Sequence, residues 1–332
     1  MVLFRPTNGV RSAGCAAAVG LAALFSISAL AGTPTSGTLF FTTFAGTQRV
    51  HSVAFNYDGV TTFTMGLIKD IAAPPGGDGL VFTSDGQLAV GGQGNAVFKV
   101  NPNAVNSFTT FNAGGTAAFH MMVAPNGTIY SSGIPGTPAS YPSDLSANGV
   151  AHPVSGDDTA IDTIIWPTSD STEAIYTASG AGGFGNVGFL DLSTFTTTRV
   201  LTNVPAAHGG TYDPFTNTVI LFGDGHITQF DPVTLALVSD FTSTGTFDQG
   251  TVDGKGHIFA ANNDGNLEFL DISGSGLVGS ADFSTSQFLA TSLDDVAPLS
   301  GGGSHPTPEP ASLSLLAIAL AGLGLVRRRK MH

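Results

Sequence analysis

The chain has 332 residues, of which 42% are hydrophobic and only 11% are charged, and it contains 44 glycines. This composition excludes a disordered chain and a coiled coil, and it is sufficient for a large buried core made mostly of β-strands joined by tight turns. The formal net charge of −13 makes nucleic acid an improbable partner, because phosphate binding needs a basic surface.

The N-terminus has the pattern of a secretory signal peptide. Arg5 and Arg11 precede an uncharged stretch rich in Ala and Leu at residues 12–30, and Ala29 and Ala31 supply the small residues of a cleavage site. We therefore expect a signal helix within residues 1–31 and cleavage after Ala31; a retained membrane anchor is the alternative. Cys15, the only cysteine, lies before the apolar run, which argues against lipidation, and its removal leaves a mature body without disulfides.

A repeat of apolar strand, turn and apolar strand fills residues 32–300. Its turns are marked by an aspartate or asparagine, and successive markers are 41, 44, 43 and 40 residues apart, at Asp85, Asn126, Asp170, Asp213 and Asp253. The spacing is typical of β-propeller blades, whose period is about 40 to 45 residues.

The outer part of each unit repeats as well. An apolar strand ending in an Asp or Asn turn recurs at residues 97–102, 187–192, 227–232 and 267–272, which predicts four strands per blade. The Pro- and Ser-containing insertion at residues 135–146 is expected to form a surface loop.

The two ends of the repeat region complement each other. Residues 38–44, 50–57 and 61–68 read as second, third and fourth strands without an innermost one, whereas residues 293–299 read as an innermost strand without outer partners. The fold class expected is therefore all-β: a six-bladed β-propeller closed by its N- and C-terminal strands, flanked by an N-terminal signal helix and a C-terminal hydrophobic helix. A seven-bladed ring or a β-sandwich is the alternative.

Polar residues stand near the start of successive innermost strands, where a propeller would bring them together at its axis. They are Asp78, His120, Asp162, His208, Asp248 and Asp294.

These residues allow three interpretations. Asp162, Asp248 and Asp294 are candidate ligands of a divalent cation such as calcium, and imidazoles with carboxylates could hold a transition metal. His120 and His208 could instead act as general acid and base on a sugar or lactone. The third interpretation is that all of them hydrogen-bond neighbouring blades and line a wet channel.

Residues 120–130 and 248–259 resemble the repeats of NHL-type, virginiamycin-lyase-like and gluconolactonase-like propellers. These families include binding modules, lyases and metal-dependent lactonases, so the resemblance implies a fold and leaves the activity open. The stretch at residues 262–266 lacks the terminal Glu of a calcium loop and is expected to be a tight hairpin turn.

The C-terminus has three parts in a fixed order after a linker at residues 301–307: Pro308-Glu309-Pro310, an apolar run at residues 311–326, and Arg327-Arg328-Arg329-Lys330. This order, over residues 308–332, resembles the PEP-CTERM sorting signal of exported proteins in Gram-negative bacteria. The resemblance implies recognition by an exosortase, a membrane cysteine protease-transpeptidase that removes the tail at or near Pro-Glu-Pro.

The apolar run at residues 311–326 is short, because about 20 residues cross a typical bilayer. The basic cluster would hold its end on the cytoplasmic side. We expect a transmembrane helix that anchors the chain transiently in the inner membrane; a permanent anchor is the alternative.

Without the signal and the tail, the body is strongly acidic, with five basic and 23 acidic residues and a net charge near −18. This acidity favours solubility or cation binding. The sequence as a whole predicts an exported binding or structural propeller at the cell surface or outside the cell, with extracellular polysaccharide as a candidate partner. The alternative is a secreted hydrolase or lyase with an axial metal or His site.

Overall fold

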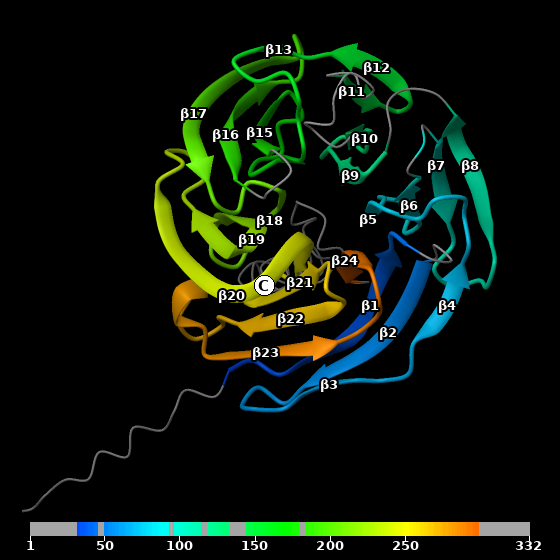
Figure 1. Ribbon diagram of the computed structural model, residues 1–332, viewed down its shortest axis with the longest axis vertical. Coiled ribbons are helices and arrows are strands. Elements are labelled where there is room, and N and C mark those ends of the chain that lie inside the picture. Colours follow the sequence, from blue (N-terminus) through cyan, green and yellow to red (C-terminus); the bar gives the residue numbers. More distant parts are fainter. Residues whose placement is uncertain are drawn as a thin grey trace, which may run out of the picture. The chain divides into compact units, whose positions relative to one another are not determined.

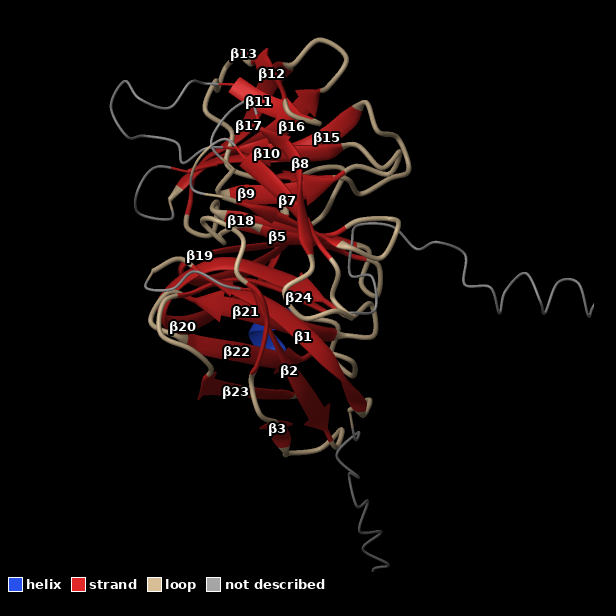
Figure 2. Cartoon of the chain, turned by 90° about the vertical axis from the view of Figure 1, so that its right-hand side faces the viewer, coloured by secondary structure: helices blue, strands red, loops and turns tan. Residues whose placement is uncertain are grey.

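The computed structural model describes residues 32–45, 50–92, 94, 96–113, 118–132, 144–179 and 184–298. In these ranges the body consists of strands and one short 3-10 helix, η1 (Val278–Ser280), as Figure 2 shows. The expected signal peptide at residues 1–31, the linker at 301–307 and the sorting segment at 308–332 with its helix at 311–326 lie outside the described residues. Within the described ranges, no helix has the length and apolar character needed to span a membrane.

The strands form antiparallel sheets that succeed one another around a common axis, as in a β-propeller (Figure 1). The first sheet holds β24 (Leu293–Pro298), β1 (Thr35–Thr43), β2 (Val50–Tyr57) and β3 (Phe63–Met65), with β4 (Lys69–Ala72) also paired to β2. The second holds β5 (Leu80–Phe82), β6 (Leu88–Gly91), β7 (Ala96–Val100) and β8 (Phe108–Ala113). The third holds β9 (His120–Val123), β10 (Ile129–Ser132), β11 (Asp144–Ala147) and β12 (Val150–Pro153).

Two larger sheets complete the ring. The fourth holds β14 (Ile164–Ile165), β15 (Glu173–Ser179), β16 (Gly185–Asp191), β17 (Thr196–Val204) and, paired parallel to β17, β13 (Ser155–Gly156). The fifth holds β18 (Gly209–Asp213), β19 (Thr218–Phe230), β20 (Leu237–Val252), β21 (His257–Asn262), β22 (Asn266–Asp271) and β23 (Phe283–Phe288).

The prediction of a propeller is confirmed, but the prediction of six blades is wrong: the described strands form five sheets. The difference arises at β20, which runs without interruption for 16 residues. Its first half pairs with β19 and its second half with β21, so two repeat units share one strand and merge into a single six-stranded sheet.

The ring is closed by strands from opposite ends of the chain, as the sequence predicts. β24 pairs antiparallel with β1 in the register Leu39↔Pro298, Phe40↔Ala297 and Phe41↔Val296. The innermost strand missing from the N-terminal part is therefore supplied by the C-terminal part. Residues 135–143 of the predicted insertion lie outside the described residues. Its remaining residues, 144–146, belong to β11.

The repeated Asp and Asn markers have a local structural role. In all five marker turns the side chain accepts a hydrogen bond from the backbone N–H two residues later, at 2.8 to 3.3 Å. This Asx-turn geometry connects an innermost strand to the next strand. In three of the turns the marker is followed by a glycine with positive φ, at Gly86, Gly127 and Gly254.

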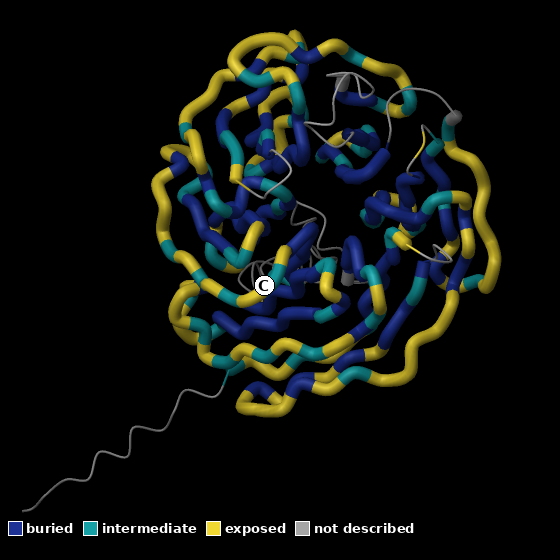
Figure 3. The backbone as a smooth tube through the Cα atoms, viewed as in Figure 1, coloured by how far each residue is buried: buried dark blue, intermediate teal, exposed yellow. Residues whose placement is uncertain are grey.

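Apolar side chains fill the space between neighbouring sheets. Figure 3 shows buried segments toward the centre of the body and exposed ones along its outer rim. β21 is buried along its whole length, whereas β23 alternates between intermediate and exposed residues, as expected for an inner and an outer strand. Around the closure, aromatic rings pack in contact, with Phe63 and Phe269 stacked at 4.3 Å between centroids.

Candidate functional site

A pocket of about 230 Å³ opens at the end of the axis where the innermost strands begin. Five of the six polar residues singled out in the sequence reach it; its lining consists of Phe44, Asp78, Phe119, His120, His208, Asp248, Asn263 and Asp294. The backbone fixes the positions of these side chains, because the residues around each strand start bond to the adjacent second strand. Examples are Asp78 N–H to Gly91 O at 2.9 Å and His208 N–H to Phe222 O at 3.1 Å.

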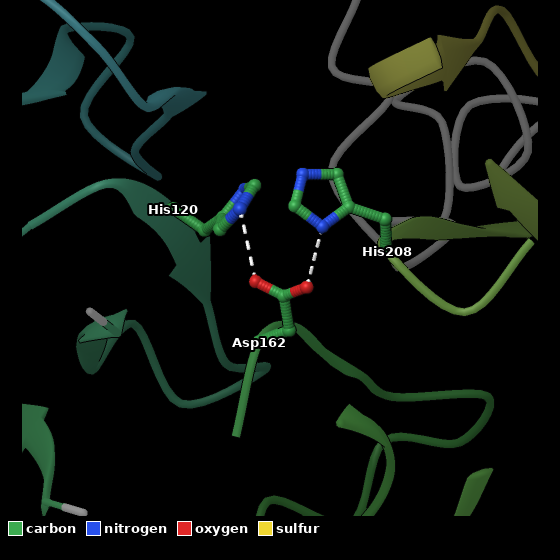
Figure 4. Close-up of side chains that lie close together, drawn as sticks. All are labelled: His120, Asp162 and His208. Carbon is green, nitrogen blue, oxygen red and sulfur yellow. Dashed lines mark hydrogen bonds and ion pairs between the residues drawn. The ribbon is translucent and has the colours of Figure 1, made fainter. Parts of the chain in front are cut away.

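The sixth residue, Asp162, lies fully buried beside the pocket and joins the two histidines (Figure 4). Its Oδ1 is 3.0 Å from His120 Nε2, and its Oδ2 is 2.6 Å from His208 Nδ1. The hydroxyl of Ser179 at the end of β15 also donates to Oδ2. Residues from three sheets thus meet around one carboxylate.

His208 lies between two carboxylates. Opposite Asp162, its Nε2 is 2.6 Å from Asp248 Oδ1, and His120 Nε2 is 4.0 Å from the same oxygen. The rings of the two histidines meet edge to face at 4.9 Å between centroids. Asn263, with its amide oriented to satisfy its neighbours, donates to Asp248 Oδ2 at 3.2 Å and so orients this carboxylate.

The carboxylates set the protonation of the histidines. Burial favours a neutral imidazole, but the Asp162 carboxylate outweighs it and raises the pKa of His120 to about 9. At His208, burial likewise favours the neutral ring, but the Asp162 and Asp248 carboxylates outweigh it and raise the pKa well above its ordinary value. In return, the imidazoliums overcome burial and lower the pKa of both carboxyl groups. At neutral pH these four side chains are therefore two cations and two anions.

Two further carboxyl groups lie on β24. Burial, followed by the negative charge of Asp248 and Asp78, raises the pKa of Asp294 well above its usual range. Burial does the same at Asp295, whose Oδ2 accepts the N–H of Leu80 at 2.8 Å. The pocket thus offers the ionised Asp248 as an acceptor beside Asp294, whose carboxyl group favours its protonated, hydrogen-donating form.

The group best placed to hold a metal among the described residues is His120, Asp162 and His208, whose ligand atoms lie within 4.8 Å of one another. Two imidazole nitrogens and one carboxylate oxygen suit a transition metal better than calcium, which prefers oxygen ligands alone. The divalent-cation site predicted from the sequence at Asp162, Asp248 and Asp294 stays a prediction. Two of its three carboxylates, Asp162 and Asp248, already contact imidazoles at hydrogen-bond distance. Within the described part of the chain, His120 Nδ1 is buried without a hydrogen-bond partner.

The sequence did not point to Ser179, Asn263 or Asp295. Asp295 follows Asp294 directly, and strand alternation would have sent it away from the axis. Ser179 and Asn263 belong to or follow second strands, and they approach the axis only because those strands end beside the pocket. Nothing in the repeat pattern distinguishes them from surface positions.

Comparison with known proteins supports both parts of the chain. The PEP-CTERM protein-sorting motif matches residues 306–330 and confirms the resemblance of the tail. Among solved structures, the chain is similar to one in the crystal structure of a nidogen/laminin complex, at 12% identity, over 79% of this chain and 97% of that chain, with a TM-score of 0.57. It is also similar to the WD40 β-propeller domain of Doa1, at 10% identity, over 73% and 91% of the two chains, with a TM-score of 0.48. The first likeness shows the fold alone. No curated protein matches the chain.

Proposed function

Because a PEP-CTERM sorting motif marks this chain for export and for processing by an exosortase at the cell surface, we propose that its propeller body is a binding module. The ligand we propose is a polyhydroxylated one, a terminal sugar of extracellular polysaccharide, held in the axial pocket. The chain would be attached to the inner membrane transiently through residues 311–326 and would act at the surface or in the extracellular matrix.

The observation that carries this proposal is the chemistry of the pocket lining. Carboxyl groups of Asp78, Asp248 and Asp294 and the Asn263 amide can exchange hydrogen bonds with several hydroxyl groups at once. Phe44 and Phe119 add apolar ring surface to the same lining. At about 230 Å³ the pocket is smaller than the roughly 300–1,000 Å³ typical of sites for drug-sized ligands, so it suits a single sugar ring.

The state of the histidines favours binding over catalysis. A general base must be unprotonated at working pH, whereas Asp162 keeps His120 protonated up to a pKa of about 9. The His120 side chain is also nearly fully buried. Protonated histidines held by buried carboxylates have fixed positions in the pocket lining, which suits a binding site.

A secreted hydrolase or lyase is the second candidate, favoured by one contact. The side chain of His208 is 20% exposed in the pocket and lies 2.6 Å from Asp248, so it could pass a proton to a bound lactone or sugar, with or without a metal held by His120 and Asp162.

The proposal is tested by titrating the exported, purified protein with oligosaccharides cut from the polysaccharide of the producing cells, using calorimetry. We expect saturable binding that Asp248→Asn weakens at least about tenfold, since it removes a charged acceptor worth about 1.5–3 kcal/mol. Glu173→Gln, an exposed carboxylate at the other end of β15 from Ser179, is the matched control and should bind normally.

Equal affinity in the Asp248→Asn variant would rule out this pocket as the binding site. Metal content measured on the same sample, and chromatography of the sugars after incubation, separate the two candidates. Cleaved or rearranged sugars that disappear with His208→Ala would favour the enzyme.

A further inference from the structure

A second buried cluster lies away from the axial pocket, at the end of β22. The Asp271 carboxylate is 0% exposed, and its Oδ1 accepts the N–H of Ser273 at 2.8 Å. Its other oxygen, Oδ2, is buried and accepts no well-formed hydrogen bond from the described residues. The Tyr57 hydroxyl is a close neighbour: burial, followed by the Asp271 carboxyl, raises the pKa of Tyr57. Such an oxygen, enclosed and ionisable, is a site for a donor group.

The nearest cationic group among the described residues does not fill this role. His257 Nε2 is 3.8 Å from Asp271 Oδ1, too far for a hydrogen bond. The ring is instead held by Asp253 Oδ2, 2.7 Å from Nδ1, and by the Thr33 carbonyl, 2.8 Å from Nε2. Both ring nitrogens of His257 are therefore already engaged.

The beginning of the body is fixed against the same cluster. Thr33 N–H donates to Ser273 Oγ at 2.9 Å, and Thr35 Oγ1 donates to Asp253 Oδ2 at 3.1 Å. These bonds, with the bond from His257 to Thr33, attach the residues just before and at the start of β1 to β21 and to the turns around it. The position of Gly32 is thereby determined by its neighbours.

Gly32 lies directly against this buried oxygen. A Cβ added to Gly32 would overlap Asp271 Oδ2 and lie 2.9 Å from Asp271 Cγ. A Cβ is about 2.5 Å from its own backbone nitrogen, so bond geometry places the Gly32 nitrogen no more than about 4.3 Å from Oδ2. Gly32 is also the residue that follows the expected cleavage site at Ala31.

We propose that Asp271 is the binding site for the new N-terminus of the mature protein. Hydrolysis of the Ala31–Gly32 peptide bond by a signal peptidase, with water as co-reactant, leaves a carboxylate on Ala31 and an ammonium group on Gly32. The Gly32 ammonium then pairs with Asp271 Oδ2. This inference depends on cleavage after Ala31 and is independent of any ligand of the axial pocket.

The chemistry explains why the precursor cannot make this contact equally well. The Gly32 amide of the precursor is neutral and has a single N–H, whereas an α-ammonium carries a charge and three donors and keeps its proton up to a pKa of about 8. His257 compensates part of the charge of the buried carboxylate at 3.8 Å, and the processed chain adds a positive charge directly beside Oδ2. Removal of the signal peptide thereby stabilises the folded body as well as freeing it.

The test compares two forms of the protein that differ by one residue. They are expressed behind a protease site that leaves either Gly32 or Ala31-Gly32 as the first residues, with the remainder of the chain unchanged. We expect the Gly32 form to melt at least about 2 °C higher, because 1 kcal/mol shifts the melting temperature of a domain this large by about 2–4 °C.

In Asp271→Asn the difference between the two forms should disappear, whereas Glu173→Gln should preserve it. Equal melting temperatures of the two wild-type forms, or a difference that persists in Asp271→Asn, would overturn the proposal. So would an exported protein whose first residue, read by mass spectrometry, is not Gly32.

A second measurement covers the case in which Asp271→Asn does not fold. The α-amino group of the folded Gly32 form should react with an acylating reagent at least about tenfold more slowly than in the unfolded chain, as quantified on the N-terminal peptide. Equal reaction rates would show a free terminus and contradict the ion pair.

Discussion

At the scale of the residue, the body places carboxyl groups where their protonation differs from that in water. Glu268 on β22 is one example outside the pocket: it is 4% exposed, and the Ser243 hydroxyl donates to its Oε2 at the long distance of 3.5 Å. Burial raises its pKa above the ordinary value of 4.5. The folded state therefore favours the protonated acid.

This shift gives a pH-dependent prediction for Glu268→Gln. The folded-state pKa is raised, so the contribution of Glu268 to stability is fully present below the unfolded pKa and is lost as the pH rises through the folded pKa. The glutamine variant should thus be more stable than the wild type at pH 7 and lose this advantage near pH 4. Urea denaturation at the two pH values measures the difference in free energy of unfolding between the variant and the wild type. An advantage of equal size at both would show that packing, and not charge, is the cause.

The axial site shows how far single residues could be predicted. A propeller brings equivalent positions of its repeat toward one axis. Comparing these positions in the sequence was therefore sufficient to identify residues that lie together in or beside the pocket: His120, Asp162, His208, Asp248 and Asp294. The pairing of Asp162 with both histidines depends on side-chain directions that no repeat period contains. The catalytic role of the histidines and the metal role of the aspartates stay predictions.

At the scale of the element, the closing pair β1 and β24 holds together residues about 250 positions apart. Its prediction succeeded because an unpaired set of strands at one end matched an unpaired strand at the other. The prediction that the last two repeat units form separate blades is wrong for a local reason. Residues 243–246 are Ser-Thr-Gly-Thr. Although Ser and Gly also occur in turns and Gly245 has a positive φ, β20 continues through this segment, which has no Pro, Asn or Asp to end the strand.

The closure can be tested with two phenylalanine truncations. Phe41 on β1 is 0% exposed in the core between the first and last sheets, whereas Phe288 on β23 is 65% exposed. Phe41→Ala should lower the free energy of unfolding by about 3–5 kcal/mol, because it leaves a cavity at the closing pair. Phe288→Ala should change it by about 0.5 kcal/mol or less. Chemical denaturation of both variants measures this; a tolerated Phe41→Ala would mean that the closing pair adds little stability.

At the scale of the whole molecule, the body carries five basic and 23 acidic residues. Like charges at this excess repel one another across the surface, and salt screens the repulsion within about 10 Å at 0.1 M. We expect the melting temperature of the mature protein to rise between 10 mM and 300 mM sodium chloride. Scanning calorimetry at both concentrations, with potassium chloride as a check for ion-specific effects, gives the answer. A falling melting temperature would mean that ion pairs such as Arg199–Asp158 outweigh the general repulsion.

The position of β24 also limits the maturation of the chain at its other end. β24 ends at Pro298, and the Pro-Glu-Pro of the sorting signal begins at Pro308. Ten residues span at most about 35 Å when fully extended. Since β24 is also the strand that closes the ring, a tail held in the bilayer as proposed would keep a folded body within this short distance of the membrane. An exosortase that removes such a tail would have to work in the narrow gap between the propeller and the membrane, and its cleavage would first allow the body to diffuse away.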